Sequence, residues 1–89
     1  MKGIVSVIGK DQMGIIAAVC NTLHEQKVNV LDISQTVLRD YFVMIMLTDC
    51  SACPLSFANL SKLLKDSGKE KGLDIRIQRE DIFNAMHRI

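Results

Sequence analysis

Apolar residues recur along this chain with two periods, one that suits strands and one that suits helices. Residues 3–9 are apolar on both faces, as in a strand at the centre of a sheet. Residues 14–26 predict a helix, because apolar side chains fall at i, i+3, i+4 and i+7, namely Ile16, Val19, Cys20 and Leu23. Residues 28–39 predict a long strand with Leu31, Ile33 and Val37 on one face and Asp32, Ser34 and Thr36 on the other.

The second half of the chain repeats this pattern of strand and helix. Residues 39–40 predict a short turn, and residues 41–47 a strand that is apolar on both faces. A second helix is expected to begin near Pro54 and to fray over residues 67–72, which are rich in glycine and charge. Its inward residues are Phe57, Leu60 and Leu64.

A strand and a short helix complete the predicted elements. Apolar and polar positions alternate over residues 73–78, which is typical of a half-buried strand. Asp81 is expected to cap a helix over residues 81–89. The apolar residues of that helix are Ile82, Phe83, Met86 and Ile89.

This order of elements predicts one α+β domain, residues 1–89, with the ferredoxin-like βαββαβ topology. Right-handed crossovers and the turn at residues 39–40 give a four-stranded antiparallel sheet with two helices on one face. Both central strands are apolar on their second face, so the C-terminal helix, another subunit, or both must cover it. A chain of 89 residues buries only about 60–65% of its unfolded surface, so association adds stability. We therefore expect a homodimer.

The connection after the first strand has the features of an anion-binding turn. Asp11, Gln12 and Met13 lead into Gly14 at the start of the helix. Helix N-termini carry unpaired N–H groups and about half a positive charge, which favours carboxylates. Gly14 leaves room for a ligand to approach the backbone, and Asn29, which opens the next strand, can donate and accept hydrogen bonds. The simpler interpretation is an ordinary helix start with Asp11 as N-cap.

The sequence around this turn resembles that of ACT domains, small regulatory modules that usually bind amino acids at dimer interfaces. The likeness covers essentially the whole chain and is closest to stand-alone bacterial and archaeal ACT proteins. It extends to the ACT modules of glycine cleavage system repressors and formyltetrahydrofolate deformylases. Many ACT domains have Pro-Gly at the helix start, where this chain has Met13-Gly14. The matching segments are Gly9-Lys10-Asp11, Gly14-Ile15-Ile16-Ala17, Asn29-Val30, Asp32-Ile33-Ser34-Gln35-Thr36-Val37-Leu38 and Tyr41-Phe42.

The resemblance implies a regulatory module that binds an amino acid or a related metabolite as a homodimer, without cofactor or metal. We expect no attached catalytic or DNA-binding domain, so regulation would need a separate partner protein. Asp11 and Asp32 suit helix capping or a ligand ammonium group better than acid–base catalysis. The expected ligand contacts are Asp11, Gln12, Met13, Gly14, Ile15, Asn29, Val30, Leu31, Asp32 and Ile33.

Composition and charge argue against several classes of protein. Hydrophobic residues make up 48% and charged residues 24% of the chain, which is typical of a globular domain. A net charge of +1 gives no electrostatic case for binding nucleic acid or an anionic membrane. No apolar run approaches the roughly 20 residues of a membrane span, and the N-terminal run is too short for a secretory signal. We therefore expect a cytoplasmic protein.

The three cysteines are Cys20, Cys50 and Cys53, an odd number that does not make a disulfide framework. Cys50 and Cys53 form a single C-x-x-C, which suits a redox pair, half a zinc site or a plain turn between strand and helix. Neither a second C-x-x-C nor a nearby histidine completes four zinc ligands. We favour the plain turn. A redox or metal-binding protein is the alternative, together with an interaction module that binds no ligand.

The sequence contains no recognisable catalytic set. Gly9 to Gly14 matches the first half of a phosphate loop, but Ile15 and Ile16 stand where Lys and Ser or Thr should follow. His24 and His87 are isolated from any nucleophile or paired acid. An RNA-recognition domain of this topology needs aromatic residues on both central strands, and the first has none. We therefore expect no enzymatic activity.

Overall fold

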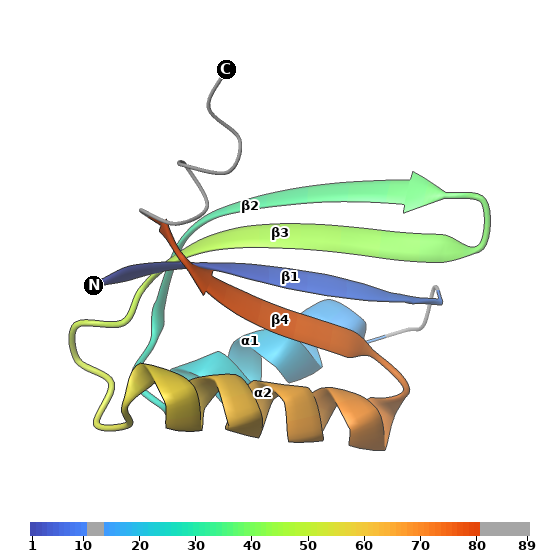
Figure 1. Ribbon diagram of the computed structural model, residues 1–89. Helices are drawn as coiled ribbons and strands as arrows, with labels where there is room; N and C mark the ends of the chain where they lie inside the picture. Colours follow the sequence, from blue (N-terminus) through green and yellow to red (C-terminus); the bar gives the residue numbers. More distant parts are fainter. Residues whose placement is uncertain (11–13, 81–89) are drawn as a thin grey trace.

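The computed structural model describes residues 1–10 and 14–80. The four strands form one antiparallel sheet in the order β2-β3-β1-β4, and both helices pack on one face of it (Figure 1). This arrangement confirms the predicted ferredoxin-like α+β topology, with β1 and β3 at the centre. The predicted helix over residues 81–89 lies outside the described residues. The elements are β1 (Lys2–Lys10), α1 (Ile15–Glu25), β2 (Asn29–Leu38), β3 (Tyr41–Asp49), α2 (Phe57–Lys71) and β4 (Asp74–Arg79).

The pairing of β1 with β3 forms the centre of the core. The two strands pair along the whole nine-residue length of each. Val5 lies opposite Met46 and Val7 opposite Met44, and all four side chains are fully buried. Directly opposite residues project on the same face of a sheet, so each pair fills one layer beneath the helices. The two methionines are core residues, as the strand pattern predicts.

Each helix buries one apolar stripe against this central pair. Ile16 and Cys20, two of the four residues predicted for the stripe of α1, flank it and are only partly buried. No helix in residues 1–10 and 14–80 is long and apolar enough to cross a membrane. The buried stripes are Ile15, Val19 and Leu23 in α1 and Leu60, Leu64 and Gly68 in α2.

The start of α2 differs from the predicted one. The helix begins at Phe57 and not near Pro54. Ser56 is its N-cap, because the Ser56 hydroxyl accepts a hydrogen bond from the Asn59 N–H at 3.2 Å. The connection from β3 is therefore longer than predicted.

The end of α2 also differs, since the helix continues through Lys71 where its composition predicts fraying. Gly68 is buried in this last part of the helix. A Cβ there would lie 2.7 Å from the carbonyl oxygen of Leu73 and 3.1 Å from Cγ1 of Ile75. The missing side chain thus lets the helix approach β4 closely, and this packing outweighs the poor helix propensity of glycine. Gly72 ends the helix with a left-handed backbone, φ 70°.

β2 is the predicted long strand, but a bulge sets its faces. The register shifts between Val30 and Asp32, so Leu31 is the extra residue of a β-bulge. Ile33 and Val37 lie opposite buried residues of β3 and share the face beneath which the helices pack, as does Val30 before the bulge. The bulge interrupts the alternation on which the predicted common face of Leu31, Ile33 and Val37 rests, so for Leu31 that face stays a prediction.

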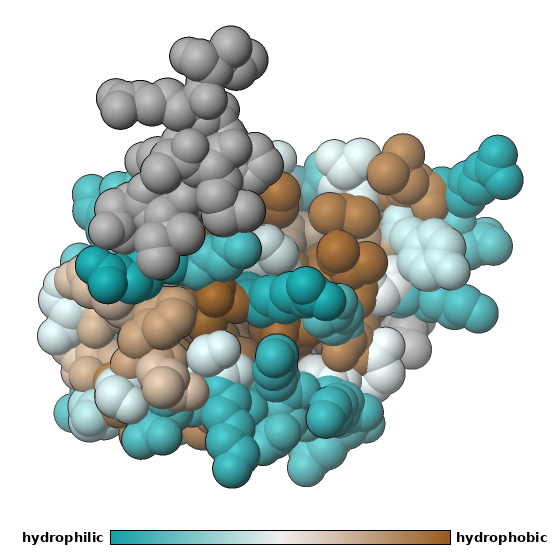
Figure 2. All heavy atoms as spheres, viewed as in Figure 1, coloured by the Kyte–Doolittle hydropathy of each residue, from teal (hydrophilic) through white to brown (hydrophobic). Residues whose placement is uncertain are grey.

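The face of the sheet away from the helices carries an apolar patch. Ile8 of β1 and Ile45 of β3 are 43% and 41% exposed on it, and Leu38 and Tyr41 extend the patch toward the β2–β3 turn. Figure 2 shows strongly apolar side chains gathered over these central strands. The apolar second face that the sequence predicts is thus present on β1 and β3.

Replacing Gly68 with alanine is expected to destabilise the protein by about 1–3 kcal/mol, although alanine normally stabilises a helix interior by about 1 kcal/mol over glycine. The added Cβ would meet the backbone oxygen of Leu73, which cannot move away without shifting β4. Urea unfolding followed by circular dichroism measures the change, with Asp66→Ala on the exposed side of α2 as control. A Gly68→Ala protein as stable as the wild type would contradict this helix–strand contact.

Candidate functional site

The start of α1 lacks the side-chain cap that α2 has. Gly14 is the N-cap residue, with a left-handed backbone of φ 83°, and no described side chain accepts a hydrogen bond from the first turn. That turn also contains no acidic residue. The first N–H groups of α1 therefore have no acceptor among the described side chains, and the positive end of the helix dipole is a favourable place for an anion.

Of the residues predicted for the turn before α1, the structure describes only Gly14 and Ile15. The N-cap is Gly14 and not Asp11, because the helix begins at Ile15. Asp11, Gln12 and Met13 lie outside the described residues, so their part in the site stays a prediction. The Ile15 side chain is 6% exposed and packs in the core, so this residue can offer a ligand its backbone N–H but not its side chain.

The left-handed backbone conformation at position 14 favours glycine. A Cβ added to Gly14 would meet no atom of the described residues within 4 Å, so space is not what demands glycine here. The left-handed φ of 83° is the reason that other residues fit poorly. Among the described residues, nothing crowds the position that a side chain would take at Gly14.

The first residues of β2 combine polar and apolar groups on an exposed strand. Asn29 is exposed and Val30 is half-buried. Leu31 and Ile33 are 45% and 38% exposed. The Asp32 carboxylate accepts a hydrogen bond from the Ile33 N–H at 2.9 Å. An amide, a carboxylate and two apolar side chains within five residues suit a small molecule with an ammonium group and an apolar part.

Within one chain, these two groups of residues lie at opposite ends of the sheet (Figure 1). Gly14 follows Lys10, which is level with Tyr41 at the start of β3, whereas Asn29 is level with Asp49 at its end. The 11 residues of α1 separate the two ends by about 16 Å. This span exceeds the size of an amino acid, so a single chain does not bring the two groups into one site.

Polar contacts of the chain N-terminus hold the end of the sheet where Asn29 lies. The Met1 ammonium group donates to Ser51 Oγ at 3.2 Å, and the Met1 carbonyl accepts from the Cys50 N–H at 2.8 Å. Ser51 in turn donates to Asp49 Oδ1 from its hydroxyl at 2.6 Å and from its N–H at 2.9 Å. These two hydrogen bonds lower the pKa of Asp49, because they favour its ionised form.

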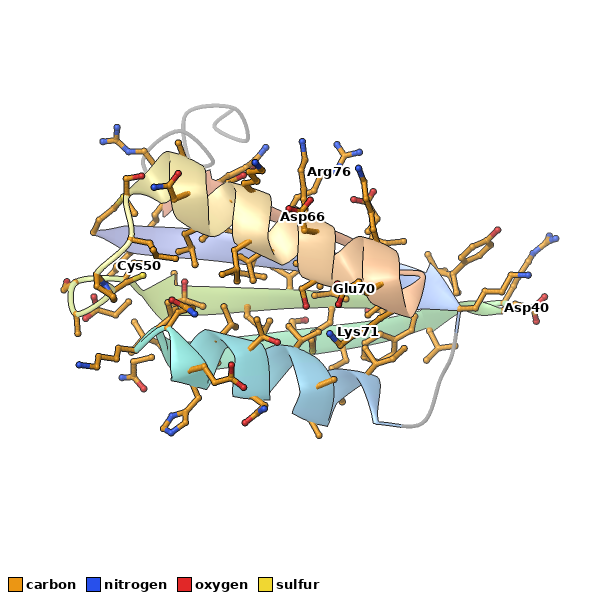
Figure 3. All side chains as sticks on the ribbon, turned by 90° about the horizontal axis from the view of Figure 1, so that it is seen from below. Asp40, Cys50, Asp66, Glu70, Lys71 and Arg76 are labelled. Atoms are coloured by element: carbon orange, nitrogen blue, oxygen red, sulfur yellow. The ribbon has the colours of Figure 1, made fainter. Side chains whose placement is uncertain are left out.

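Cys50, labelled in Figure 3, and Cys53 lie in a hydrogen-bonded turn after β3. The Cys53 N–H donates to the Cys50 carbonyl at 3.1 Å. The buried Thr48 hydroxyl donates to the Gly3 carbonyl at 2.8 Å, which leaves its oxygen to accept from the Cys50 thiol at 3.7 Å. The described residues contain no group of three or more His, Cys, Asp or Glu that could hold a metal ion.

A separate hollow of about 480 Å³ lies along α2, away from the predicted ligand contacts. In Figure 3, Glu70 lies on the side of α2 that faces α1. Neither Gly14 nor the first residues of β2 line this hollow, so it gives no support to the predicted site. Its lining residues are Leu55, Asn59, Lys62, Leu63, Asp66, Ser67 and Glu70.

Comparison with known proteins identifies the family. The ACT domain family matches residues 3–78, and the chain belongs to this family. A UPF0237 protein of Clostridium acetobutylicum is 53% identical over 89 residues, which is the full length of both chains. The solved structure of an ACT domain protein from Streptococcus pneumoniae is 39% identical and has a TM-score of 0.85 over 98% of each chain.

Two longer proteins share the fold in part of their chains. A formyltetrahydrofolate deformylase from Pseudomonas putida has a TM-score of 0.78 at 14% identity, over 91% of this chain and 29% of its own. A putative glycine cleavage system transcriptional repressor has a TM-score of 0.71 at 15% identity, over 86% of this chain and 44% of its own. Both likenesses concern the fold, and they confirm the resemblance predicted from the sequence.

Replacing Cys50 and Cys53 together with serine is expected to leave folding and ligand binding intact, because both residues serve a turn. Zinc titration against a chromogenic chelator should show no stoichiometric site in the wild type. Cys20→Ser, which alters a partly buried thiol in α1, is the control for losing a thiol elsewhere. Tight stoichiometric zinc that disappears only in the double variant would overturn the plain-turn interpretation.

Proposed function

We propose that this protein is a regulatory module that binds an amino acid or a related small metabolite as a homodimer and acts on a separate partner protein. Membership of the ACT domain family supports the class of small regulatory ligand-binding module. The observation that carries the proposal is the start of α1, where Gly14 leaves the first N–H groups without a described side-chain acceptor. Such a helix start stabilises a carboxylate, a group that every amino acid has.

The edge strand β2 supports pairing with a second copy of the chain. Its ten residues include no Lys, Arg or Pro, and Asp32 is its only charged residue. Sheet edges that avoid pairing are usually short, charged or interrupted by proline. Val37 and Leu38 are 58% and 62% exposed and would lose contact with water on pairing. Two copies joined through β2 about a twofold axis would form one eight-stranded sheet.

Antiparallel pairing of two β2 strands would also unite the predicted site. The start of one β2 would then lie beside the end of the other. That end, Leu38, is level with Tyr41 and hence with Lys10, just before the helix start. Asn29 of one copy would therefore lie near Gly14 of the other. The helix start would bind the ligand carboxylate.

Such a dimer would suit a regulatory role that needs no catalysis by the protein itself. A ligand held between two copies favours the paired state, since anything that binds one state selectively stabilises it. A partner protein that recognises the paired sheet would then respond to the ligand. The competing function is an interaction module without a ligand, and a metabolite screen separates the two.

The protein is expected to sediment as a dimer at micromolar concentration, because the β2 edge is long and almost uncharged. Val37→Lys places a charge on that edge and should shift the equilibrium toward monomers. Gln78→Lys makes the same kind of change on the opposite edge strand and should leave the dimer intact. Sedimentation equilibrium measures both. A monomeric wild type, or a dimer indifferent to Val37→Lys, would contradict pairing through β2.

A thermal-shift screen of amino acids and folate-pathway metabolites is expected to identify a ligand. At about 100 times its dissociation constant, a ligand stabilises the fold by roughly 2.7 kcal/mol, which raises the melting temperature of a domain this small by about 10–20 °C. Asn29→Ala should reduce the shift by removing a polar contact. Catalytic turnover of a screened compound, abolished by Asp11→Asn in folded protein, would defeat the proposal.

Mixed dimers test whether the site lies between subunits. Gly14→Val and Asn29→Ala are each expected to weaken ligand binding in their own homodimers, so that neither keeps a site of wild-type affinity. After subunit exchange in an equal mixture, about half of the dimers combine both variants, and each carries one unaltered site. Calorimetry should therefore recover about a quarter of the wild-type sites. Gly14→Asn, which tolerates a left-handed backbone better, replaces Gly14→Val if the latter fails to fold. Recovery of no sites would contradict a shared site.

A further inference from the structure

The second edge strand, β4, borders a groove that the proposed ligand site does not use. Two hollows of about 300 and 320 Å³ lie between β4 and α2, and both are lined by Lys65 and Asp74. Because they share these residues, the two hollows are neighbours, and together they are called here the β4 groove. Ser61, Arg76, Ile77 and Gln78 complete the lining of one hollow, and Lys69, Leu73 and Ile75 that of the other.

The backbone along this groove is available for pairing. β1 occupies one side of β4, from Ile8 opposite Asp74 to Gly3 opposite Arg79. Within the described residues, the backbone hydrogen bonds of turns and loops include none to residues 74–78. Every second residue of a strand directs its N–H and C=O to the same side, so the outer side of β4 can accept a further strand.

The helix wall of the groove is positively charged at a spacing that matches an extended strand. Lys65 and Lys69 lie four residues apart on α2, about 6 Å along the helix axis. Alternate side chains of a strand repeat every 6.8 Å or so. Acidic side chains at positions i and i+2 of an added strand would therefore meet the two lysines in turn.

The strand wall of the groove contributes one ion pair. Arg76 Nε lies 3.2 Å from Asp74 Oδ1, and both side chains are exposed. Figure 3 shows Arg76 projecting past α2 on the side away from α1. The charged residues that line the groove carry a net charge of +2. They are Lys65, Lys69, Arg76 and Asp74. This charge favours an acidic occupant.

We propose that the β4 groove binds an extended acidic segment of a partner protein, which joins the sheet beside β4 with acidic side chains at alternate positions toward α2. The proposal goes beyond ligand sensing, because it gives the separate partner protein a docking site at the edge of the sheet opposite β2. Peptides bind in this way in other proteins that leave a groove between an edge strand and a helix.

The charges of the groove distinguish this occupant from two others. A second copy of the chain would bring two positively charged helix walls together, which disfavours self-pairing through β4. A nucleic acid strand would place continuous phosphates against Asp74, which lines both hollows. A peptide strand avoids both conflicts, because it can alternate acidic side chains with neutral ones.

A fluorescent nine-residue peptide that alternates Val and Glu is the probe, and the matching Val and Lys peptide is the control. Fluorescence anisotropy should show binding of the acidic peptide alone. Lys65→Glu with Lys69→Glu should weaken that binding about tenfold or more. Lys27→Glu with Lys62→Glu makes the same change in net charge outside the groove and should leave binding unchanged. Equal binding of the two peptides, or the same affinity in both double variants, would overturn the proposal.

Backbone pairing has its own test. Two acidic peptides, one N-methylated at every Val and the other at every Glu, keep their charges but each lose one set of donors. One of the two should fail to bind, since one set faces β4. Equal binding of both N-methylated peptides and the parent would contradict strand addition. The metabolite thermal shift should persist in the Lys65→Glu, Lys69→Glu variant, so failure of peptide docking is distinguishable from failure of ligand sensing.

Discussion

The antiparallel pairing of β1 with β3 is the interaction on which the rest of this structure depends. Its buried layers of valine against methionine form the floor on which both helices pack. The register of this pair also decides which end of the sheet each connecting segment leaves from. Lys10 marks the end that leads to Gly14, and Asp49 marks the end beside Asn29. The separation of the two halves of the predicted ligand site is therefore a consequence of the core.

The central pair also leaves two edge strands of very different character. β2 is long and almost uncharged, and its exposed apolar residues lie on both of its faces. β4 is shorter, and lysines of α2 border its outer side. Because edge strands offer unpaired backbone, side-chain charge decides what may join them. In our account β2 joins a second copy, β4 joins an acidic partner, and the ligand lies at the β2 junction.

Much of this architecture could be predicted from residue patterns, and the errors have identifiable physical causes. The order of the elements, right-handed crossovers and the short turn at residues 39–40 were enough to predict the sheet, and the two-sided apolar strands agreed with a central position for β1 and β3. The bulge at Leu31 was missed because it is a shift of backbone register that leaves the composition of β2 unchanged. The continuation of α2 to Lys71 was not predicted, because the contact of Gly68 with β4 is a tertiary one that overrides local helix propensity. The Ser56 cap had a usable signal, since serine is a preferred N-cap residue and Phe57 begins the buried pattern.

The candidate site was less predictable than the fold. Ile15 matched a family pattern, yet as the first residue of a buried helix stripe it faces the core. The distance between Gly14 and Asn29 follows from the βαβ order, because a helix runs back along the sheet between two parallel strands. What no pattern in a single chain could supply is the neighbour that would bring those ends together.

The central claim is that β2 pairs with β2 of a second copy, and hydrogen exchange of the β2 amides measured by NMR tests it most directly. Alternate amides of this strand point away from β3. If the account is right, those outward amides exchange as slowly as the inward ones at concentrations where the protein is dimeric, and speed up on dilution. Rapid exchange of the outward amides in a protein that is dimeric by sedimentation would show that the copies meet elsewhere.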